Sequence, residues 1–100
     1  MAGMIMEVAY MDILPGHEEG FEEAFAQAKD VVARAPGFRV IHLHRGVERP
    51  GTYLVAIGWD TVEDHMEGFR NSDLFTQWRA LLGPHFAGTP TVEHWRLFDE

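Results

Sequence analysis

The chain has 100 residues, 46% of them hydrophobic and 24% charged, which suits a single domain spanning residues 1–100. Eight Lys and Arg stand against sixteen Asp and Glu, and the net charge of −8 argues against a nucleic-acid partner. The lack of cysteine excludes disulfides, thiolate metal sites and cysteine nucleophiles. Neither a membrane-spanning apolar run nor a secretory leader is visible, so we expect a cytoplasmic protein with no membrane partner.

The first predicted element is a strand over residues 4–14, with apolar residues on both of its alternating faces. One face carries Met4, Met6, Val8 and Tyr10, and the other carries Ile5, Ala9, Met11 and Ile13. Such a strand needs cover on both sides. Pro15 and Gly16 end it.

A helix is predicted next, over residues 17–35. Apolar residues recur there at spacings of three and four, which places on one stripe Phe21, Phe25, Ala28, Val32 and Ala35. Four glutamates occupy its first turns, where the positive end of the helix dipole favours carboxylates, so they have a structural explanation. Pro36 and Gly37 end the helix.

Two paired strands are predicted over residues 38–47 and 52–60. Pro50 and Gly51 between them predict a turn, because proline presets φ and glycine tolerates positive φ. The second of these strands is apolar on both faces, so we expect it to lie centrally in a sheet.

The remaining chain predicts two helical segments and a strand. Asp60 or Thr61 caps a short helix that runs to about Phe69. A second helix begins at residues 71–73, ends at Gly83 and Pro84, and turns inward Leu74, Phe75, Trp78, Leu81 and Leu82. A last strand follows over residues 91–98.

This order of elements predicts a ferredoxin-like α+β fold, βαββαβ, with a four-stranded antiparallel sheet and helices on one face. The helices cover one face only, yet the first and third strands are apolar on both. If the second face of the sheet were exposed to solvent, its apolar patch would be larger than monomers usually tolerate. We therefore expect a homodimer that buries this face, sheet against sheet.

The layout resembles the antibiotic biosynthesis monooxygenase (ABM) domain. The resemblance covers nearly the whole chain and is carried by Gly37 and Phe38 at the start of a strand and by the segments 54–60, 72–75 and 90–94. It implies a dimeric α+β barrel with a pocket in each subunit between sheet and helices. In the quinone-forming oxygenases of this group, polyphenols are oxidised by O₂ without metal or flavin. The implied function is a monooxygenase without cofactor, acting on a small aromatic or polycyclic compound.

Site residues carry over by their spacing from the tryptophan at the strand end. Trp59 matches that tryptophan, His65 falls where the quinone-forming enzymes have a tyrosine, and Arg79 falls on their arginine. Their asparagine, four residues before the tryptophan, is Val55 here. The resemblance thus implies His65 as the base, Arg79 as the stabiliser of an anion and Trp59 as a wall of the pocket. As further lining we expect the aromatic side chains of Phe69, Trp78 and Phe86.

Two other functions stay open. One is a dimeric module without catalytic activity that binds a small hydrophobic metabolite. The other is a haem or metal binder, which the resemblance disfavours because Arg79 stands near the position of the iron-binding histidine in haem-degrading relatives. His42 and His44 share one strand face, but a third metal ligand from the last strand, such as His94, would lie at the opposite edge of the sheet. We therefore assign no metal.

Overall fold

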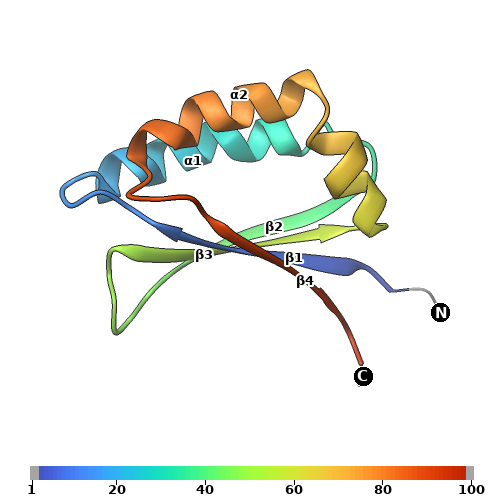
Figure 1. The fold of residues 1–100 in the computed structure, drawn as a ribbon, viewed down its shortest axis with the longest axis horizontal. Coiled ribbons are helices and arrows are strands. Elements are labelled where there is room, and N and C mark those ends of the chain that lie inside the picture. Colours follow the sequence, from blue (N-terminus) through green and yellow to red (C-terminus); the bar gives the residue numbers. More distant parts are fainter. Residues whose placement is uncertain (1–2, 99–100) are drawn as a thin grey trace.

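Four antiparallel strands and two principal helices make up the fold in the computed structural model, which describes residues 3–98 (Figure 1). The bounds of the elements are β1 (Ile5–Asp12), α1 (Glu18–Val32), β2 (Phe38–Arg45), β3 (Thr52–Trp59), η1 (Asp64–Phe69), α2 (Asp73–Leu82), η2 (Gly83–His85) and β4 (Thr91–Arg96). The strand order is β2-β3-β1-β4, and every neighbouring pair is antiparallel. The predicted ferredoxin-like α+β fold is confirmed.

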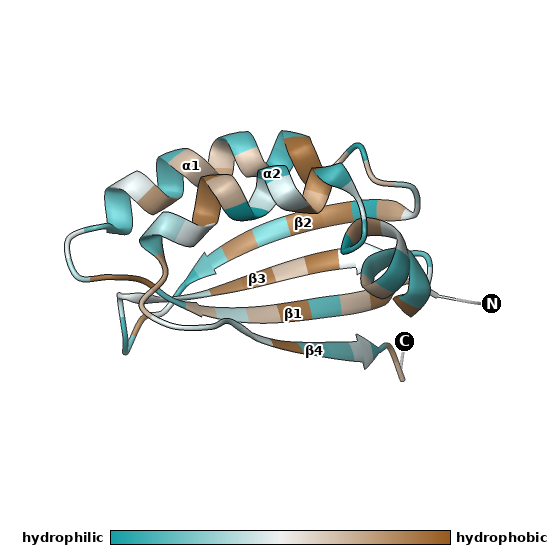
Figure 2. Cartoon of the chain, turned by 45° about the horizontal axis from the view of Figure 1, so that its top comes forward, coloured by the Kyte–Doolittle hydropathy of each residue, from teal (hydrophilic) through white to brown (hydrophobic). Residues whose placement is uncertain are grey.

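Both helices lie on one face of the sheet, and the other face is left without a covering layer (Figures 1 and 2). The predicted stripe of α1 is buried, and it packs on the inward residues of the two central strands. Those inward residues alternate along β1 and β3, and they include Ala9, Met11, Tyr53, Val55 and Ile57. The core therefore lies between the sheet and the helices.

The uncovered face carries the second alternating set of β1. Met6 and Val8 are half-buried there, and Tyr10 is 38% exposed. Trp95, the partner of Met6 in the register of β1 and β4, is 56% exposed. The expectation that the helices cover one of two apolar faces is confirmed within a single copy.

Several boundaries differ from those predicted. The last strand ends at Arg96, and Phe98 is fully exposed beyond it. The short helix after Thr61 is capped as expected, since the Thr61 hydroxyl accepts the N–H of Asp64 at 3.1 Å. It then widens into the π-helical turn η1, whose end is marked by the Arg70 N–H bonded to the His65 carbonyl at 3.0 Å. Hydrophobic periodicity does not distinguish a π turn from an α turn over six residues.

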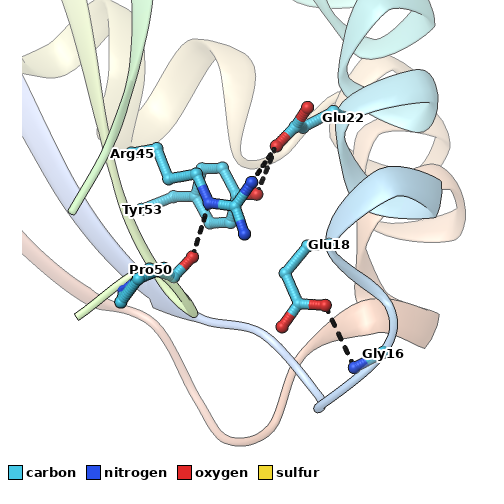
Figure 3. A network of polar contacts seen from close by, with 6 residues as sticks. All are labelled: Gly16, Glu18, Glu22, Arg45, Pro50 and Tyr53. Atoms are coloured by element: carbon cyan, nitrogen blue, oxygen red, sulfur yellow. Dashed lines mark hydrogen bonds and ion pairs between the residues drawn. The ribbon is translucent and has the colours of Figure 1, made fainter. Parts of the chain in front are cut away.

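A polar network joins α1 to the turn between β2 and β3 (Figure 3). The Glu22 carboxylate accepts a short hydrogen bond from the buried Tyr53 hydroxyl and lies 3.3 Å from the Arg45 guanidinium. Arg45 also donates to the Pro50 carbonyl at 2.7 Å. The network fixes the end of the sheet that carries the hairpin turn.

In the part of the chain described here, no helix is both long and apolar enough to cross a membrane.

Candidate functional site

A cavity of about 420 Å³ opens on the inner face of the sheet, beneath η1 and α2. Residues of β1, β4 and the loop after η2 complete its lining. Aromatic rings form much of the wall, and these are Phe69, Phe75, Trp78 and Phe86. Phe69 stands edge-on to both Phe75 and Trp78, with ring centroids 5.4 and 6.0 Å apart, which locks the wall in place. Such a cavity suits a flat aromatic ligand.

One side of the cavity is polar, because Glu7 of β1 and His65 of η1 line it. Among residues 3–98 they are the only buried polar or charged side chains, at 5% and 3% exposure. The His65 Nε2 lies 3.3 Å from the Glu7 Oε1, and Trp59 Nε1–H donates to the same oxygen at 2.9 Å. The His65 ring stacks on Trp59, with centroids 5.5 Å apart. Buried polar groups of this kind persist only with partners, and these have them.

His94 extends this cluster to the edge of the sheet. The register of β1 and β4 sets His94 directly opposite Glu7, so its side chain shares the inner face. Its Nε2 lies 2.9 Å from the Nδ1 of His65. A hydrogen bond between two imidazoles requires one nitrogen to donate and the other to accept. We name Trp59, Glu7, His65 and His94 the polar cluster.

Burial shifts the pKa values of the two inner members in opposite senses. Loss of solvent raises the pKa of Glu7 to about 7, against smaller opposing effects of the Trp59 hydrogen bond and the charge of Arg70. Loss of solvent lowers the pKa of His65 to about 4, and the charges of His94 and Arg70 act in the same direction. At neutral pH His65 is therefore uncharged, and Glu7 is close to the midpoint of its titration.

Two positively charged residues, both arginines, line the same cavity as the Glu7 carboxyl group. Arg70, just after η1, and Arg79 of α2 both place a guanidinium over the Phe75 ring, 5.6 and 6.0 Å from its centroid. Neither lies within ion-pair distance of a carboxylate among residues 3–98. Both arginines are exposed at the cavity, and two positive charges beside one opening can attract an anionic ligand.

The structure brings together five of the six residues that the sequence proposed for the site. The cavity lining includes His65, Arg79, Phe69, Trp78 and Phe86. Trp59 is not part of that lining. It is fully buried on the inner face of β3, where it contacts His65 and Phe69 of η1, so it lies one layer behind the cavity. Its contribution to the site is the indole N–H that it donates to Glu7.

Sequence reasoning missed Glu7, Arg70 and His94. Glu7 had a signal, because it is the one charged residue in the inward set of β1 between Ile5 and Ala9. His94 was considered only as a metal ligand with His42 and His44. Those two histidines lie on β2, at the opposite edge of the sheet from β4. Glu7, His65 and His94 touch one another in a row, but within residues 3–98 no group of three such side chains has the arrangement of a metal site.

Comparisons with known proteins show which family this chain resembles. The family model described as Antibiotic biosynthesis monooxygenase matches residues 4–81. The uncharacterized protein YczJ of Bacillus subtilis is 39% identical over 93 residues, which are 93% of this chain and 98% of YczJ.

Solved structures agree with this match. A candidate antibiotic biosynthesis monooxygenase from Bordetella bronchiseptica is 42% identical, with a TM-score of 0.94 over 96% of this chain and 98% of the other. SnoaB, a cofactor-independent oxygenase from Streptomyces nogalater, is 19% identical, with a TM-score of 0.80 over 99% of this chain and 97% of SnoaB, and so shares the fold. On the family match and these closely similar relatives, the chain belongs to the antibiotic biosynthesis monooxygenase family.

Proposed function

We propose that the protein is a cofactor-independent oxygenase that oxidises a small phenolic or polycyclic aromatic compound with O₂. The observation that carries this proposal is the buried Glu7–His65 pair at one side of an aromatic cavity. A group that takes a phenolic proton near neutral pH must have a pKa in that range, and Glu7 meets this requirement. Removal of the proton turns the phenol into an electron-rich anion that can reduce O₂.

The overall reaction balances without a further reductant. A phenol with hydrogen on the carbon opposite its hydroxyl reacts with one O₂ to give a quinone and one water. The O–O bond breaks, one oxygen bonds to that ring carbon, and the other leaves as water with the hydroxyl and ring hydrogens. The aromatic compound loses four electrons and O₂ gains them. The Glu7–His65 pair takes up the first proton of this sequence.

Arg79 and the aromatic walls supply the remaining parts of this function. We assign to Arg79 the stabilisation of the phenolate, because this residue lines the cavity and its guanidinium lies over the ring of Phe75, another lining residue. Phe69, Trp78 and Phe86 hold the ring. Val55, which stands at the position of the family's asparagine, is fully buried, and Glu7 on the neighbouring strand brings a polar group instead.

An activity screen tests the proposal. 1-Naphthols and anthrones (the latter reacting as their enols), which carry hydrogen on the carbon opposite the oxygen, are first ranked by thermal shift, and O₂ uptake is then measured with each ligand in the presence of a chelator. We expect uptake that is insensitive to the chelator and falls at least about tenfold in Arg79→Gln, since loss of one charge-stabilising donor costs this much or more. Arg49→Gln, in the exposed turn between β2 and β3, is the matched control and keeps full activity.

Two results contradict the proposal. One is O₂ uptake no faster than without protein for every ligand in the set. If ligands bind but none is oxidised, the protein is a binding module without catalytic activity. The other is an Arg79→Gln variant as active as the unaltered chain.

We also propose that two copies form a homodimer through the uncovered sheet face. The support is the apolar set on that face, where Tyr10 and Trp95 remain 38% and 56% exposed in a single copy. The face opposite the helices can receive an identical sheet without disturbing the cavity, which lies on the helix side (Figure 1).

A further inference from the structure

Each ring nitrogen of His65 has a protein group beside it. Its Nδ1 faces His94 at 2.9 Å and its Nε2 faces Glu7 at 3.3 Å, while Trp59 covers one side of the ring. A neutral imidazole has one donor and one acceptor nitrogen, and both are directed at protein groups here. For His65 to take a proton from a bound phenol, one of these contacts would have to break.

The Glu7 carboxylate is different, because its two oxygens have different surroundings. Oε1 accepts the Trp59 N–H and contacts His65, whereas Oε2 has no hydrogen-bond partner among residues 3–98. No buried side-chain nitrogen or oxygen in that range lacks a partner, so Oε2 retains contact with open space. Glu7 lines the cavity, which provides open space beside this carboxyl group.

We infer that Glu7 Oε2 is the atom that accepts the proton of the bound phenol, and that His65 is a positioning residue held by His94. This inference rests on the proposed function and replaces His65, the base that the sequence comparison implied. In the step, the phenolic O–H bond breaks, an O–H bond forms on Oε2, and the carboxylate becomes a neutral carboxylic acid. The electron pair of the broken bond stays on the phenolate oxygen, and nothing is oxidised or reduced in this step.

The charged groups around Glu7 are consistent with this assignment. Arg70 follows η1, Arg79 comes from α2, His65 from η1 and His94 from β4. The charge of Arg70 favours the ionised carboxylate before the step, and the two cavity arginines face the anion that forms. The pKa values agree in direction, because that of Glu7 is raised and that of His65 is lowered. A neutral imidazole with a lowered pKa is a weak base, whereas a desolvated carboxylate is a strengthened one.

Carbon-13 NMR on protein labelled in its glutamate carboxyls tests the assignment without any turnover. The Glu7 signal is identified by its loss in Glu7→Gln, and 4-cyanophenol is the probe, since its neutral and ionised forms differ in ultraviolet absorbance. We expect the probe to move the Glu7 carboxyl signal toward its protonated value while the His65 ring nitrogens stay neutral. A Glu7 signal that does not move, or a His65 ring that becomes imidazolium, overturns the inference.

Kinetics provide a second and separate readout once a substrate is found. Glu7→Gln should lower O₂ uptake by roughly 10²-fold or more, the usual contribution of a general base, and Glu7→Asp should restore part of it. The rate with unaltered protein should rise with pH around 7, as Glu7 ionises, and this rise should vanish in Glu7→Gln. His65→Gln should move the midpoint of the rise instead of removing it. Glu19→Gln, exposed on α1, is the control.

The two readouts separate failure of the inference from failure of the function. Protonation of Glu7 by the bound phenol without O₂ uptake by any ligand supports the inference and rejects the oxygenase. Uptake of O₂ with a normal pH profile in Glu7→Gln supports the oxygenase and rejects the inference.

Discussion

Glu7 and His65 respond to the same burial with opposite effects on stability. The pKa of Glu7 rises from 4.5 to about 7 on folding, so the folded state binds the extra proton and its stability falls as pH rises across that range. The pKa of His65 falls from 6.5 to about 4, so the folded state binds fewer protons and its stability rises with pH across that range. Between pH 4.5 and 6.5 the two slopes cancel.

Single substitutions should separate these slopes. In Glu7→Gln the His65 contribution remains, and the free energy of unfolding should increase with pH between pH 4.5 and 6.5, by roughly 1 kcal/mol per pH unit. In His65→Gln it should decrease by a similar amount over the same interval. Urea unfolding at several pH values measures both, and parallel pH profiles for the two variants would contradict the assigned burial of this pair.

The residue scale also shows what the sequence could reveal of the site. Glu7 interrupts an inward apolar set, and that position alone marks it as a buried carboxyl group. Arg79 and His65 were proposed from their spacing within one family, and both line the cavity. Arg70 and His94 could not be found in this way, because their places depend on the wide turn of η1 and on β4 pairing beside β1. These are tertiary facts that no local pattern records.

At the scale of elements, the loop between α1 and β2 packs against the start of η1. Gly37 has φ of +86°, and a Cβ there would overlap the Asp64 carboxyl group at the start of η1. Gly16, between β1 and α1, has the same φ but open space around it. A non-glycine residue at either position is strained, and only at Gly37 does it also collide.

Alanine at these two glycines should therefore have unequal effects. Gly16→Ala should cost about 1 kcal/mol of stability from the backbone alone, and Gly37→Ala about 2 kcal/mol or more, since Asp64 must move. Urea unfolding gives both values. Equal losses would mean that Asp64 moves freely, and that the Gly37 contact does not fix η1.

The network of Figure 3 offers a test at the other end of the sheet. Tyr53→Phe removes the hydroxyl that donates to Glu22 and should lower the free energy of unfolding by about 1 kcal/mol. An unchanged urea midpoint for Tyr53→Phe would show that the hydroxyl pairs equally well with water when the chain is unfolded.

Elements with clear periodicity were the most predictable part of the fold. The apolar stripe of α1 predicted that this helix packs on the sheet, and the strands with two apolar faces predicted that β1 and β3 lie at its centre. Both predictions are confirmed. Strand ends were predicted too long, because Leu97 and Phe98 are apolar yet lie beyond the last pairing residue of β4. Apolar character indicates burial in some assembly, and it does not show where a hydrogen-bonded ladder stops.

At the scale of the whole molecule, the uncovered sheet face predicts association. Sedimentation at micromolar concentration should give a particle of about twice 11.4 kDa. Val8→Lys places a charge in the middle of that face and should shift the particle to a single copy, whereas Glu19→Lys on the far side of α1 should not. A stable single copy of the unaltered chain would contradict the dimer.

Labelled oxygen tests most directly whether the whole molecule works as an oxygenase. The protein is supplied with ¹⁸O₂ and the naphthol or anthrone that it oxidises fastest, and the product is analysed by mass spectrometry. The proposed reaction predicts one heavy oxygen in the quinone, with the second in water, and formation of this product should depend on Glu7 and Arg79. A product without heavy oxygen, or labelled product formed equally well by the Glu7→Gln and Arg79→Gln variants, would contradict it.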